Sequence, residues 1–251
     1  MPQITIGDVN INYKIQGNGL PLLMIIGFSF SLLDWGTELP DLLAPHYQLI
    51  LFDNRDAGLT SLSRKDYNIA DMADDTVGLL NALNIPKAHI FGVSMGGAIA
   101  QALALKYPSK VDKLILGCTF AGGTCSEYGN FNAFLNGNLL DLLFTPSYIQ
   151  AHQQTLDDHL ANVRPFHSKG GALQRQLQAL TTHNTCDTLS TLTAQTLIIT
   201  GDSDLVIPPS NSTVLVNKIA KAQLAIISDA AHGFSFSHAD QTAQLIHNFL
   251  T

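Results

Sequence analysis

The chain has 251 residues, of which 46% are hydrophobic, so it is long enough to bury a sizeable core within one α/β domain. Its 13 lysine and arginine residues against 20 aspartate and glutamate residues give a net charge of −7, which argues against binding to nucleic acid or to an anionic membrane surface. No apolar run reaches the roughly 18 residues that span a bilayer, and the first residues lack the pattern of a secretion signal. We therefore expect a soluble, cytoplasmic protein without a membrane span.

The three cysteines, Cys118, Cys125 and Cys186, show neither a CxxC pair nor the spacing with histidine that is typical of a zinc site. An odd number of cysteines also argues against a disulfide framework. We therefore expect reduced, partly buried thiols and no bound metal.

Short β-rich runs alternate with helical patterns in the first half of the chain. The predicted strands are residues 3–6, 10–16, 21–26, 47–52, 89–93 and 111–117. Residues 69–83 and 94–106 space their apolar side chains as helices do, and Pro108 ends the second helix because the residue before proline avoids the α region. Strands that feed crossover helices predict a mostly parallel sheet with helices on both faces.

Strand patterns vanish between residues 120 and 192, where leucines and aromatic residues recur at helical spacing. They resume at 195–200 and 222–227, which brings the sheet to eight strands, and a last helix is predicted at 239–250. We expect one core made of residues 1–119 and 193–251, with residues 120–192 inserted into it as a helical cap.

Ser94 lies in the motif Gly92-Val93-Ser94-Met95-Gly96, between a predicted strand and a predicted helix. A serine in such a sharp turn is exposed above the sheet edge, and the glycines two residues away on each side relieve crowding. The helix N-terminus behind it supplies amide donors and the positive end of a dipole, which favour a developing oxyanion. Ser94 is the candidate nucleophile.

A serine hydroxyl needs an imidazole to take its proton and a carboxylate to orient that imidazole. Asp204 follows the strand 195–200 and His232 follows the strand 222–227. Both therefore lie at carboxyl ends of strands, the edge of the sheet where Ser94 is also expected. His232 is the candidate base and Asp204 the candidate acid.

Other residues near these positions remain alternatives. His238 lies six residues beyond His232, but at the approach to the last helix. Asp202 is the main alternative for the acid, and Asp229 is another. Both aspartates are also typical of loop turns, where an Asx side chain bonds local backbone groups.

The whole chain resembles the α/β-hydrolase superfamily, in particular small bacterial esterases and acyl hydrolases with a helical cap. The resemblance rests on five segments: IIGFSFSLLDW, FDNRDAGLTS, GVSMGG, GDSDLVIP and AAHGFSFSHAD. It implies Ser94 as nucleophile, Asp204 as acid, His232 as base, and an oxyanion hole made of the backbone N–H groups of Phe28 and Met95. It implies no cofactor and no metal.

The chain departs from this pattern at the turn after residue 25. Many relatives have His-Gly where this chain has Ile26-Gly27, so a hydrogen bond from that imidazole is missing. Since the donor in the turn is a backbone N–H, we expect catalysis to persist. In the loop FDNRDAGLTS, Asp53, Arg55 and Asp56 are expected to form structural ion pairs that tie loops together.

We expect an enzyme that cleaves carboxylic esters of small-molecule acyl substrates (EC 3.1.1.-). The resemblance also admits a C–C bond hydrolase, a perhydrolase or a methyl esterase acting on a carrier-bound acyl chain. A noncatalytic ligand receptor is the alternative from another class. The sequence leaves the oligomeric state open. Apolar residues of the expected cap are candidates for the pocket lining: Phe120, Tyr128, Phe131, Phe134, Leu135, Leu139, Leu140, Leu142, Leu143, Phe144 and Tyr148.

Overall fold

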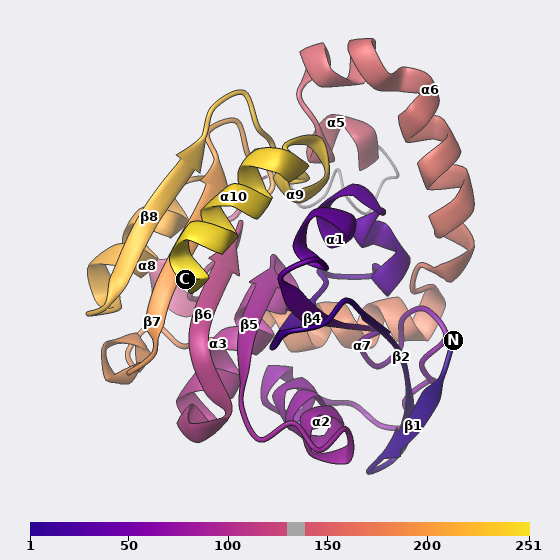
Figure 1. Ribbon diagram of the computed structural model, residues 1–251, viewed down its shortest axis with the longest axis vertical. Coiled ribbons are helices and arrows are strands. Elements are labelled where there is room, and N and C mark those ends of the chain that lie inside the picture. The colour runs from indigo at the N-terminus through magenta and orange to yellow at the C-terminus, as the bar shows by residue number, and fades with distance from the viewer. Residues whose placement is uncertain (130–138) are drawn as a thin grey trace.

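A computed structural model describes residues 1–129 and 139–251 (Figure 1). Within these residues, eight strands form a sheet in the order β1-β2-β4-β3-β5-β6-β7-β8. The strands are β1 Gln3–Ile6, β2 Val9–Gln16, β3 Leu20–Ile25, β4 Tyr47–Phe52, β5 Ala88–Val93, β6 Val111–Gly117, β7 Gln195–Gly201 and β8 Ala222–Ile227. β2 pairs antiparallel with β1 and β4, whereas β3 to β8 are parallel. The predicted mostly parallel, eight-stranded sheet is confirmed.

Alternate side chains of the central strands enter two apolar cores on opposite faces of the sheet. On one face, residues of β3 such as Leu23 pack with α2 (Ile69–Ala82), α3 (Met95–Lys106) and α8 (Ser210–Lys218). On the other face, residues such as Met24 pack with α1 (Glu38–Leu43) and α10 (Ala239–Leu250), which Figure 1 shows in front of the strands. Helices therefore cover both faces, as predicted.

The predicted helices at 69–83, 94–106 and 239–250 agree with α2, α3 and α10 to within one residue. The sequence pattern does not predict α1 and α8. α1 has six residues and includes Pro40, and α8 has the sequence SNSTVLVNK, which is rich in weak helix formers. Packing on the sheet stabilises these two helices where local propensity does not.

The described residues between β6 and β7 contain three α-helices and no strand of the sheet. The helices are α5 (Leu139–Leu143), α6 (Pro146–Val163) and α7 (Gly170–Thr181). Figure 1 shows α5 and α6 above the carboxyl ends of the strands. These helices fall within the expected cap at 120–192. Phe131, Phe134 and Leu135 of that prediction lie outside the described residues.

The expectation of three reduced cysteines is wrong, because Cys125 and Cys186 form a disulfide. Cys118 is a free, buried thiol. The bonded pair is 61 residues apart in the chain, with Cα atoms 5.9 Å apart, and it joins the segment after β6 to the segment before β7. Spacing alone did not predict the bond, since only the folded insertion brings these two residues together.

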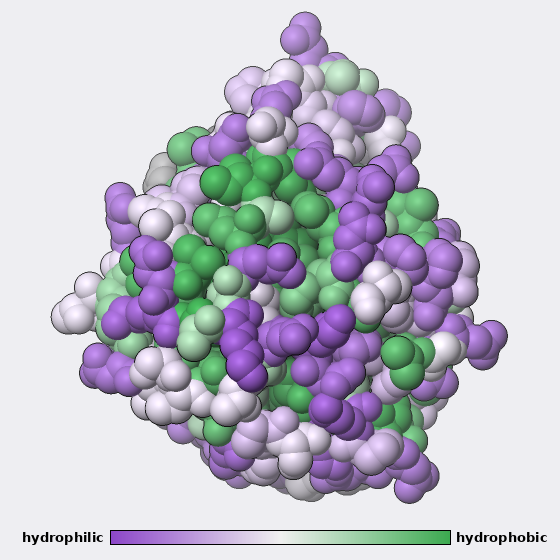
Figure 2. Space-filling model, turned by 60° about the vertical axis from the view of Figure 1, so that its left-hand side comes forward, coloured by the Kyte–Doolittle hydropathy of each residue, from purple (hydrophilic) through white to green (hydrophobic). Residues whose placement is uncertain are grey.

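The surface of one side of the molecule is not uniform in polarity. Figure 2 shows hydrophobic side chains gathered in the upper half of this view, bordered by hydrophilic ones. This is the height at which Figure 1 draws α5, α9 (Phe234–Ser237) and the start of α10.

No helix in the described part of the chain combines the length and hydropathy needed to cross a membrane.

Candidate active site

Ser94 occupies a strained turn between β5 and α3. Its backbone has φ 55° and ψ −122°, outside the regions that L-residues ordinarily adopt. A Cβ at Gly92 would collide with the carbonyl oxygen of Gly96, and one at Gly96 would collide with that of Ile25. Both glycines of the motif are thus required by close backbone approach, and the turn leaves Ser94 partly exposed above the sheet.

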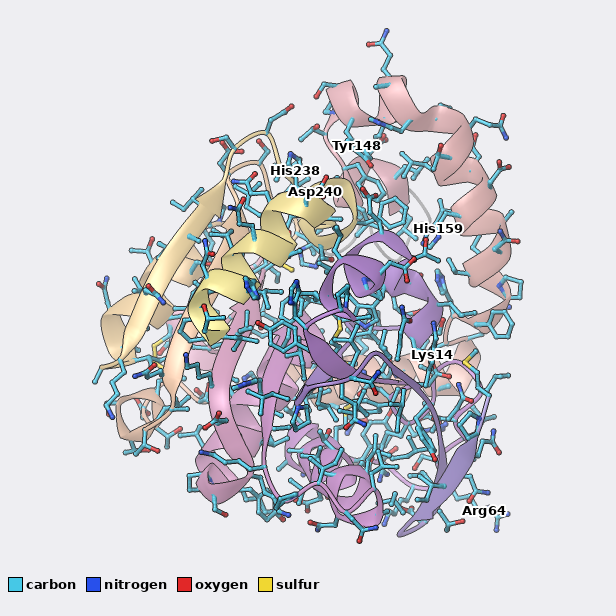
Figure 3. All side chains as sticks on the ribbon, viewed as in Figure 1. Lys14, Arg64, Tyr148, His159, His238 and Asp240 are labelled. Atoms are coloured by element: carbon cyan, nitrogen blue, oxygen red, sulfur yellow. A yellow bond between two sulfur atoms is a disulfide. The ribbon has the colours of Figure 1, made fainter. Side chains whose placement is uncertain are left out.

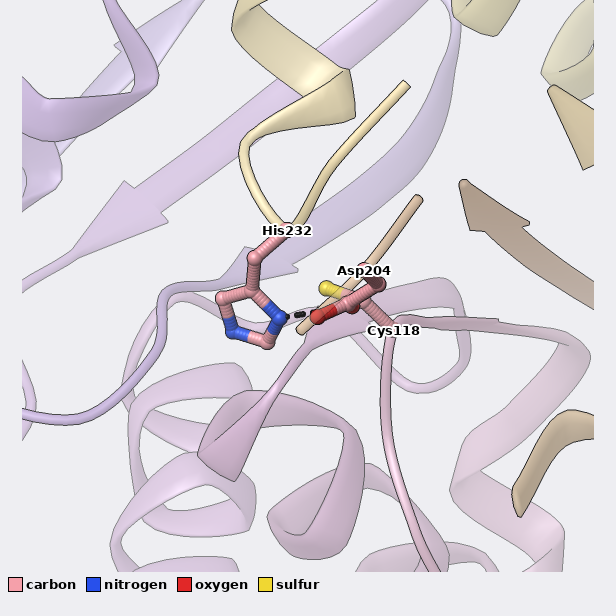
Figure 4. Close-up of side chains that lie close together, drawn as sticks. All are labelled: Cys118, Asp204 and His232. Carbon is pink, nitrogen blue, oxygen red and sulfur yellow. Dashed lines mark hydrogen bonds and ion pairs between the residues drawn. The ribbon is translucent and has the colours of Figure 1, made fainter. Parts of the chain in front are cut away.

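His232 and Asp204 meet in the loops after β8 and β7, as expected from their positions (Figure 4). The Nδ1 atom of His232 lies 2.8 Å from Oδ2 of Asp204. The other oxygen, Oδ1, accepts hydrogen bonds of 2.9 Å from the backbone N–H groups of Val206 and Ile207. A carboxylate only accepts, so Nδ1 carries the proton and Nε2 is left as the acceptor that a general base needs.

The pKa of His232 reflects its buried position beside a carboxylate. Burial by itself lowers this pKa, but Asp204 and, to a smaller extent, Cys118 raise it well above its ordinary value. Both His232 and Asp204 are buried. The imidazolium that forms when His232 accepts a proton is therefore stabilised by its partner.

Ser94 and His232 line the same cavity, which we call the catalytic cavity. It also includes Gly27 and Phe28 of the turn after β3, and side chains of α5 and α6. A second cavity, lined by residues such as Phe120 and Leu180, also reaches Ser94. The open space is about 70 Å³ in the catalytic cavity and about 230 Å³ in the second. Ser94 thus stands where two pockets meet, which suits a substrate with groups on both sides of the bond cleaved.

The expected oxyanion donors lie beside Ser94. Phe28 lines the catalytic cavity, and a Cβ on the preceding Gly27 would lie 3.2 Å from Cβ of Ser94. Met95 is the first residue of α3, where amides have no acceptor within the helix. Both predicted donors therefore belong to segments that border Ser94, and their role in an oxyanion hole stays a prediction.

Two amide side chains hold the turn that carries Phe28. In this turn, Ile26 stands where many relatives have a histidine. Asn54 donates from Nδ2 to the carbonyl oxygen of Ile26 at 3.0 Å. Gln176 of α7 accepts through Oε1 from the backbone N–H of Ser29 at 2.8 Å, and donates through Nε2 to the carbonyl oxygen of Arg55 at 2.9 Å. Gln176 is fully buried, and the sequence pattern did not single it out.

The alternative residues take other places. His238 lies at the junction of α9 and α10, where Figure 3 labels it, and its Nδ1 pairs with Oγ of Ser237 at 2.9 Å. Asp202 is exposed and accepts from Ser203, and Asp229 is exposed and accepts from Ser147. None of the three lines the catalytic cavity.

Two of the three charged residues after β4 form the expected ion pairs. Asp53 forms none within the described residues, and instead accepts from the backbone N–H groups of Leu32 and Leu59. Arg55 pairs with Asp75 of α2 at 2.6 Å. Asp56, which is fully buried, pairs with Arg175 of α7 at 2.8 Å.

The pocket lining is only partly the predicted one. Of the described candidates, Leu143 and Phe144 line the catalytic cavity, and Phe120 and Tyr128 line the second cavity. Leu139 and Leu142 are packed in apolar clusters instead. Several lining residues were not predicted from the sequence: Leu156, His159 and Leu160 of α6, Val206, and Phe236 of α9. The three residues of α6 share a helical spacing, which by itself does not reveal what that face of the helix contacts.

Cys118, Asp204 and His232 are a group of side chains in the described part of the chain that could hold a metal ion, with one potential ligand atom of each within 4.8 Å of the others. Cys118 lies at the end of β6, behind the other two in Figure 4. Nδ1 of His232 and Oδ2 of Asp204 already bond one another. A metal at these atoms would replace the hydrogen bond that orients the imidazole, so we assign it no role in the reaction.

The family follows from a comparison with known proteins. The family model described as "alpha/beta hydrolase fold" matches residues 21–239. The chain belongs to this family. It is an enzyme, a hydrolase of the α/β fold.

Relatives of this α/β hydrolase act as hydrolases according to their names. The chain is 29% identical to 2-hydroxymuconate semialdehyde hydrolase of Pseudomonas sp. (strain CF600), over an alignment of 265 positions that covers 99% of this chain and 93% of that protein. A meta-cleavage product hydrolase from Pseudomonas fluorescens IP01 is 26% identical, with a TM-score of 0.84 and coverage of 100% and 97% of the two chains. A thermophilic esterase from Thermogutta terrifontis is 22% identical, with a TM-score of 0.86 and coverage of 100% and 98%, and shows the shared fold.

Proposed function

We propose that this hydrolase cleaves carboxylic esters through an acyl-enzyme on Ser94. One observation carries the proposal: a serine in a strained strand-to-helix turn shares a cavity with a buried histidine whose Nδ1 is held 2.8 Å from a carboxylate. Asp204 fixes the imidazole so that Nε2 faces the reaction as a base. No step requires a metal or an organic cofactor.

In the reaction, Oγ of Ser94 attacks the ester carbonyl while its proton passes to Nε2 of His232. The backbone N–H groups of Phe28 and Met95 stabilise the tetrahedral oxyanion, each by about 3 kcal/mol in the transition state. His232 then protonates the leaving alcohol. It next takes a proton from water, the resulting hydroxide attacks the acyl group, and the carboxylic acid leaves as Ser94 regains its proton.

The test is the variant Ser94→Ala with a p-nitrophenyl ester series of increasing acyl length. We expect turnover to fall by at least about 10³-fold, since removal of a nucleophile leaves only binding and oxyanion stabilisation. The catalytic cavity has little room, so an optimum at short acyl chains would place the acyl group there, whereas an optimum at longer chains would place it in the larger second cavity. Turnover that survives the substitution would refute the mechanism.

A fluorophosphonate probe separates this enzyme from a ligand receptor with the same pocket. We expect stoichiometric labelling of the wild type and none of Ser94→Ala. A folded protein that does not react would favour the receptor.

Cleavage of a carbon–carbon bond is the second candidate. The relative named 2-hydroxymuconate semialdehyde hydrolase, aligned over nearly the whole chain, favours it. To distinguish the two functions, kcat/KM is measured for 2-hydroxymuconate semialdehyde alongside the esters. A higher value for an ester supports ester cleavage, and a higher value for the semialdehyde supports C–C bond cleavage.

A further inference from the structure

The catalytic cavity contains a second imidazole besides that of His232. α6 turns the residues Leu156, His159, Leu160 and Val163 toward the core, at the spacing of one helical face. Three of these are aliphatic, and His159 is the exception. Figure 3 shows His159 on the inner side of α6.

His159 lies where the cavity adjoins the outside. A groove between α6 and the core, lined by residues such as Glu38 and Tyr148, adjoins the catalytic cavity at His159 and Phe236, the residues common to both linings. The two rings are 4.7 Å apart between centroids. In the part of the chain that the structure describes, His159 has no hydrogen-bond partner, so its ring nitrogens are left for a ligand.

Asp34 also lines this end of the cavity, but both of its oxygens are occupied. Oδ1 is 2.8 Å from Nε2 of His167, and Oδ2 accepts from the backbone N–H of Ser31 at 2.9 Å. These bonds hold Asp34 in place, and no hydrogen bond joins it to His159 within the described residues.

The charges of the cavity disfavour an anionic substrate. No lysine or arginine is among its lining residues in the described ranges 1–129 and 139–251, and the sequence of residues 130–138 has none either. Burial lowers the pKa of His159, although Asp34 opposes the shift. A carboxylate here would lose its hydration next to Asp34 without meeting a cation.

A neutral imidazole has one N–H donor and one nitrogen acceptor. A hydroxyl group matches it, because it both accepts and donates. An alkyl chain in the same place would bury the imidazole without a partner, which costs free energy.

We propose that His159 is a specificity-determining residue that binds a neutral hydroxyl group on the part of the substrate that extends from Ser94 toward α6. The inference rests on the proposed ester hydrolysis and names its substrate class: short esters that carry a hydroxyl group. The hydroxyl can belong to the acyl part or to the alcohol part of the ester.

The test compares three matched esters with the wild type: a plain acyl chain, the same chain with a terminal hydroxyl, and the same chain with a terminal carboxylate, for several short lengths. A second set places the same groups on the alcohol part of an acetate ester. At the best length in one set, we expect kcat/KM to be about three- to tenfold higher for the hydroxyl ester than for the plain ester. The carboxylate ester should be the poorest of the three.

Three variants assign the effect to His159. His159→Leu should bring the ratio of kcat/KM for the hydroxyl ester to that for the plain ester down to about one. His159→Gln, which keeps a donor and an acceptor, should retain part of the preference. His46→Leu makes the same change at an exposed position just before β4, among the residues of neither the catalytic cavity nor the groove, and should keep the preference.

A preference that persists in His159→Leu, or a wild type that favours the carboxylate ester, would overturn the inference. If either result is found and Ser94→Ala nevertheless abolishes turnover, the proposed function stands and only the role of His159 is refuted. If Ser94→Ala retains turnover, the proposed function fails first.

Discussion

The two long helices of the insertion are attached to the core in different ways. α7 is tied to two core loops by buried polar contacts. Gln176 bonds the backbone of Ser29 and of Arg55, and Arg175 forms a bidentate ion pair with Asp56, with N···O distances of 2.8 and 2.9 Å. Such contacts have fixed directions and leave costly unpaired groups when they break.

α6 is held mainly by apolar packing. Its Leu156, Leu160 and Val163 form a cluster with α5 residues, apart from the two main cores of the sheet. Within the described residues, the side-chain hydrogen bonds from α6 to the core all come from Ser147, whose Oγ donates to the two carboxylate oxygens of Asp229. Apolar contacts are non-directional, so they tolerate shifts that the contacts of α7 do not.

The difference assigns the helices different tasks. α7 contacts the turn that carries Phe28, so its proposed task is to hold that oxyanion donor in place. α6 forms a wall of the catalytic cavity and borders the outer groove, so its proposed task is to select the substrate. Substitutions in α7 should therefore affect rate and stability, whereas those in α6 should affect selectivity.

Gln176→Leu should have the largest effect. It leaves the N–H of Ser29 and the carbonyl of Arg55 buried and unpaired, so the turn that carries Phe28 is expected to shift. Because a small displacement of an oxyanion donor weakens transition-state binding, kcat should fall on the order of 10²-fold with little change in KM. Steady-state kinetics with the best ester measures both.

Gln174→Leu is the matched control, since it makes the same change two residues away at an exposed position of α7. It should leave kcat unchanged. If Gln176→Leu lowers only the stability and keeps the wild-type kcat, α7 contributes to folding alone and does not position the turn that carries Phe28.

Arg175→Met should destabilise the fold. Methionine keeps most of the aliphatic packing but leaves the fully buried carboxylate of Asp56 without its cation. We expect the free energy of unfolding to fall by about 2 kcal/mol, less than for a fully buried pair, because Arg175 is 22% exposed. Urea denaturation measures the change.

The control is Arg64→Met, at an exposed arginine for which no ion pair is found within the described residues; Figure 3 labels it far from α6. Its unfolding free energy should equal that of the wild type. An equal value for Arg175→Met would mean that the pair contributes nothing to stability.

The sheet could be predicted because each strand carries its own local signal. Runs such as residues 47–52 and 111–117 are apolar and bounded by turn residues, and they are strands with those limits in the structure. α1 and α8 have no such signal, since Pro40 and a run of Ser, Asn, Thr and Val disfavour helices locally. Their stability comes from tertiary packing, which a local pattern does not contain.

Some residues of the candidate site could likewise be predicted from local signals, and others could not. Ser94, Asp204 and His232 follow strand ends, and parallel strands bring such ends to one edge, so their proximity could be predicted. Gln176 and His159 lie on helices of the insertion, and their roles depend on which way each helix faces. The disulfide between Cys125 and Cys186 depends on how the same insertion folds.

Leu156→Ala tests whether α6 selects the substrate. It removes side-chain atoms from the wall of the catalytic cavity and enlarges it. For the best short ester, kcat/KM should fall about fourfold, roughly the value of one buried methylene, and the optimum should move to a longer acyl chain. An unchanged optimum would mean that the acyl chain does not contact Leu156.

The smallest change expected concerns the pH dependence, which distinguishes the two imidazoles of the cavity. Since only neutral His232 accepts the proton of Ser94, and its pKa is raised, kcat/KM should rise with pH around a midpoint above that of an ordinary histidine. Burial lowers the pKa of His159, so this residue is already neutral in that range and His159→Leu should leave the midpoint unchanged. A midpoint that moves in His159→Leu would show that the α6 imidazole takes part in the proton transfer.

The raised pKa of His232 makes stability fall with rising pH, whereas kcat/KM rises. The contribution of protonated His232 is fully present below the pKa of histidine in the unfolded chain and is lost as the pH rises through the folded-state value. The enzyme should therefore gain activity over the pH range in which this contribution disappears. Urea denaturation of the wild type across that range checks the trend, and an increase in stability attributable to His232 would contradict it.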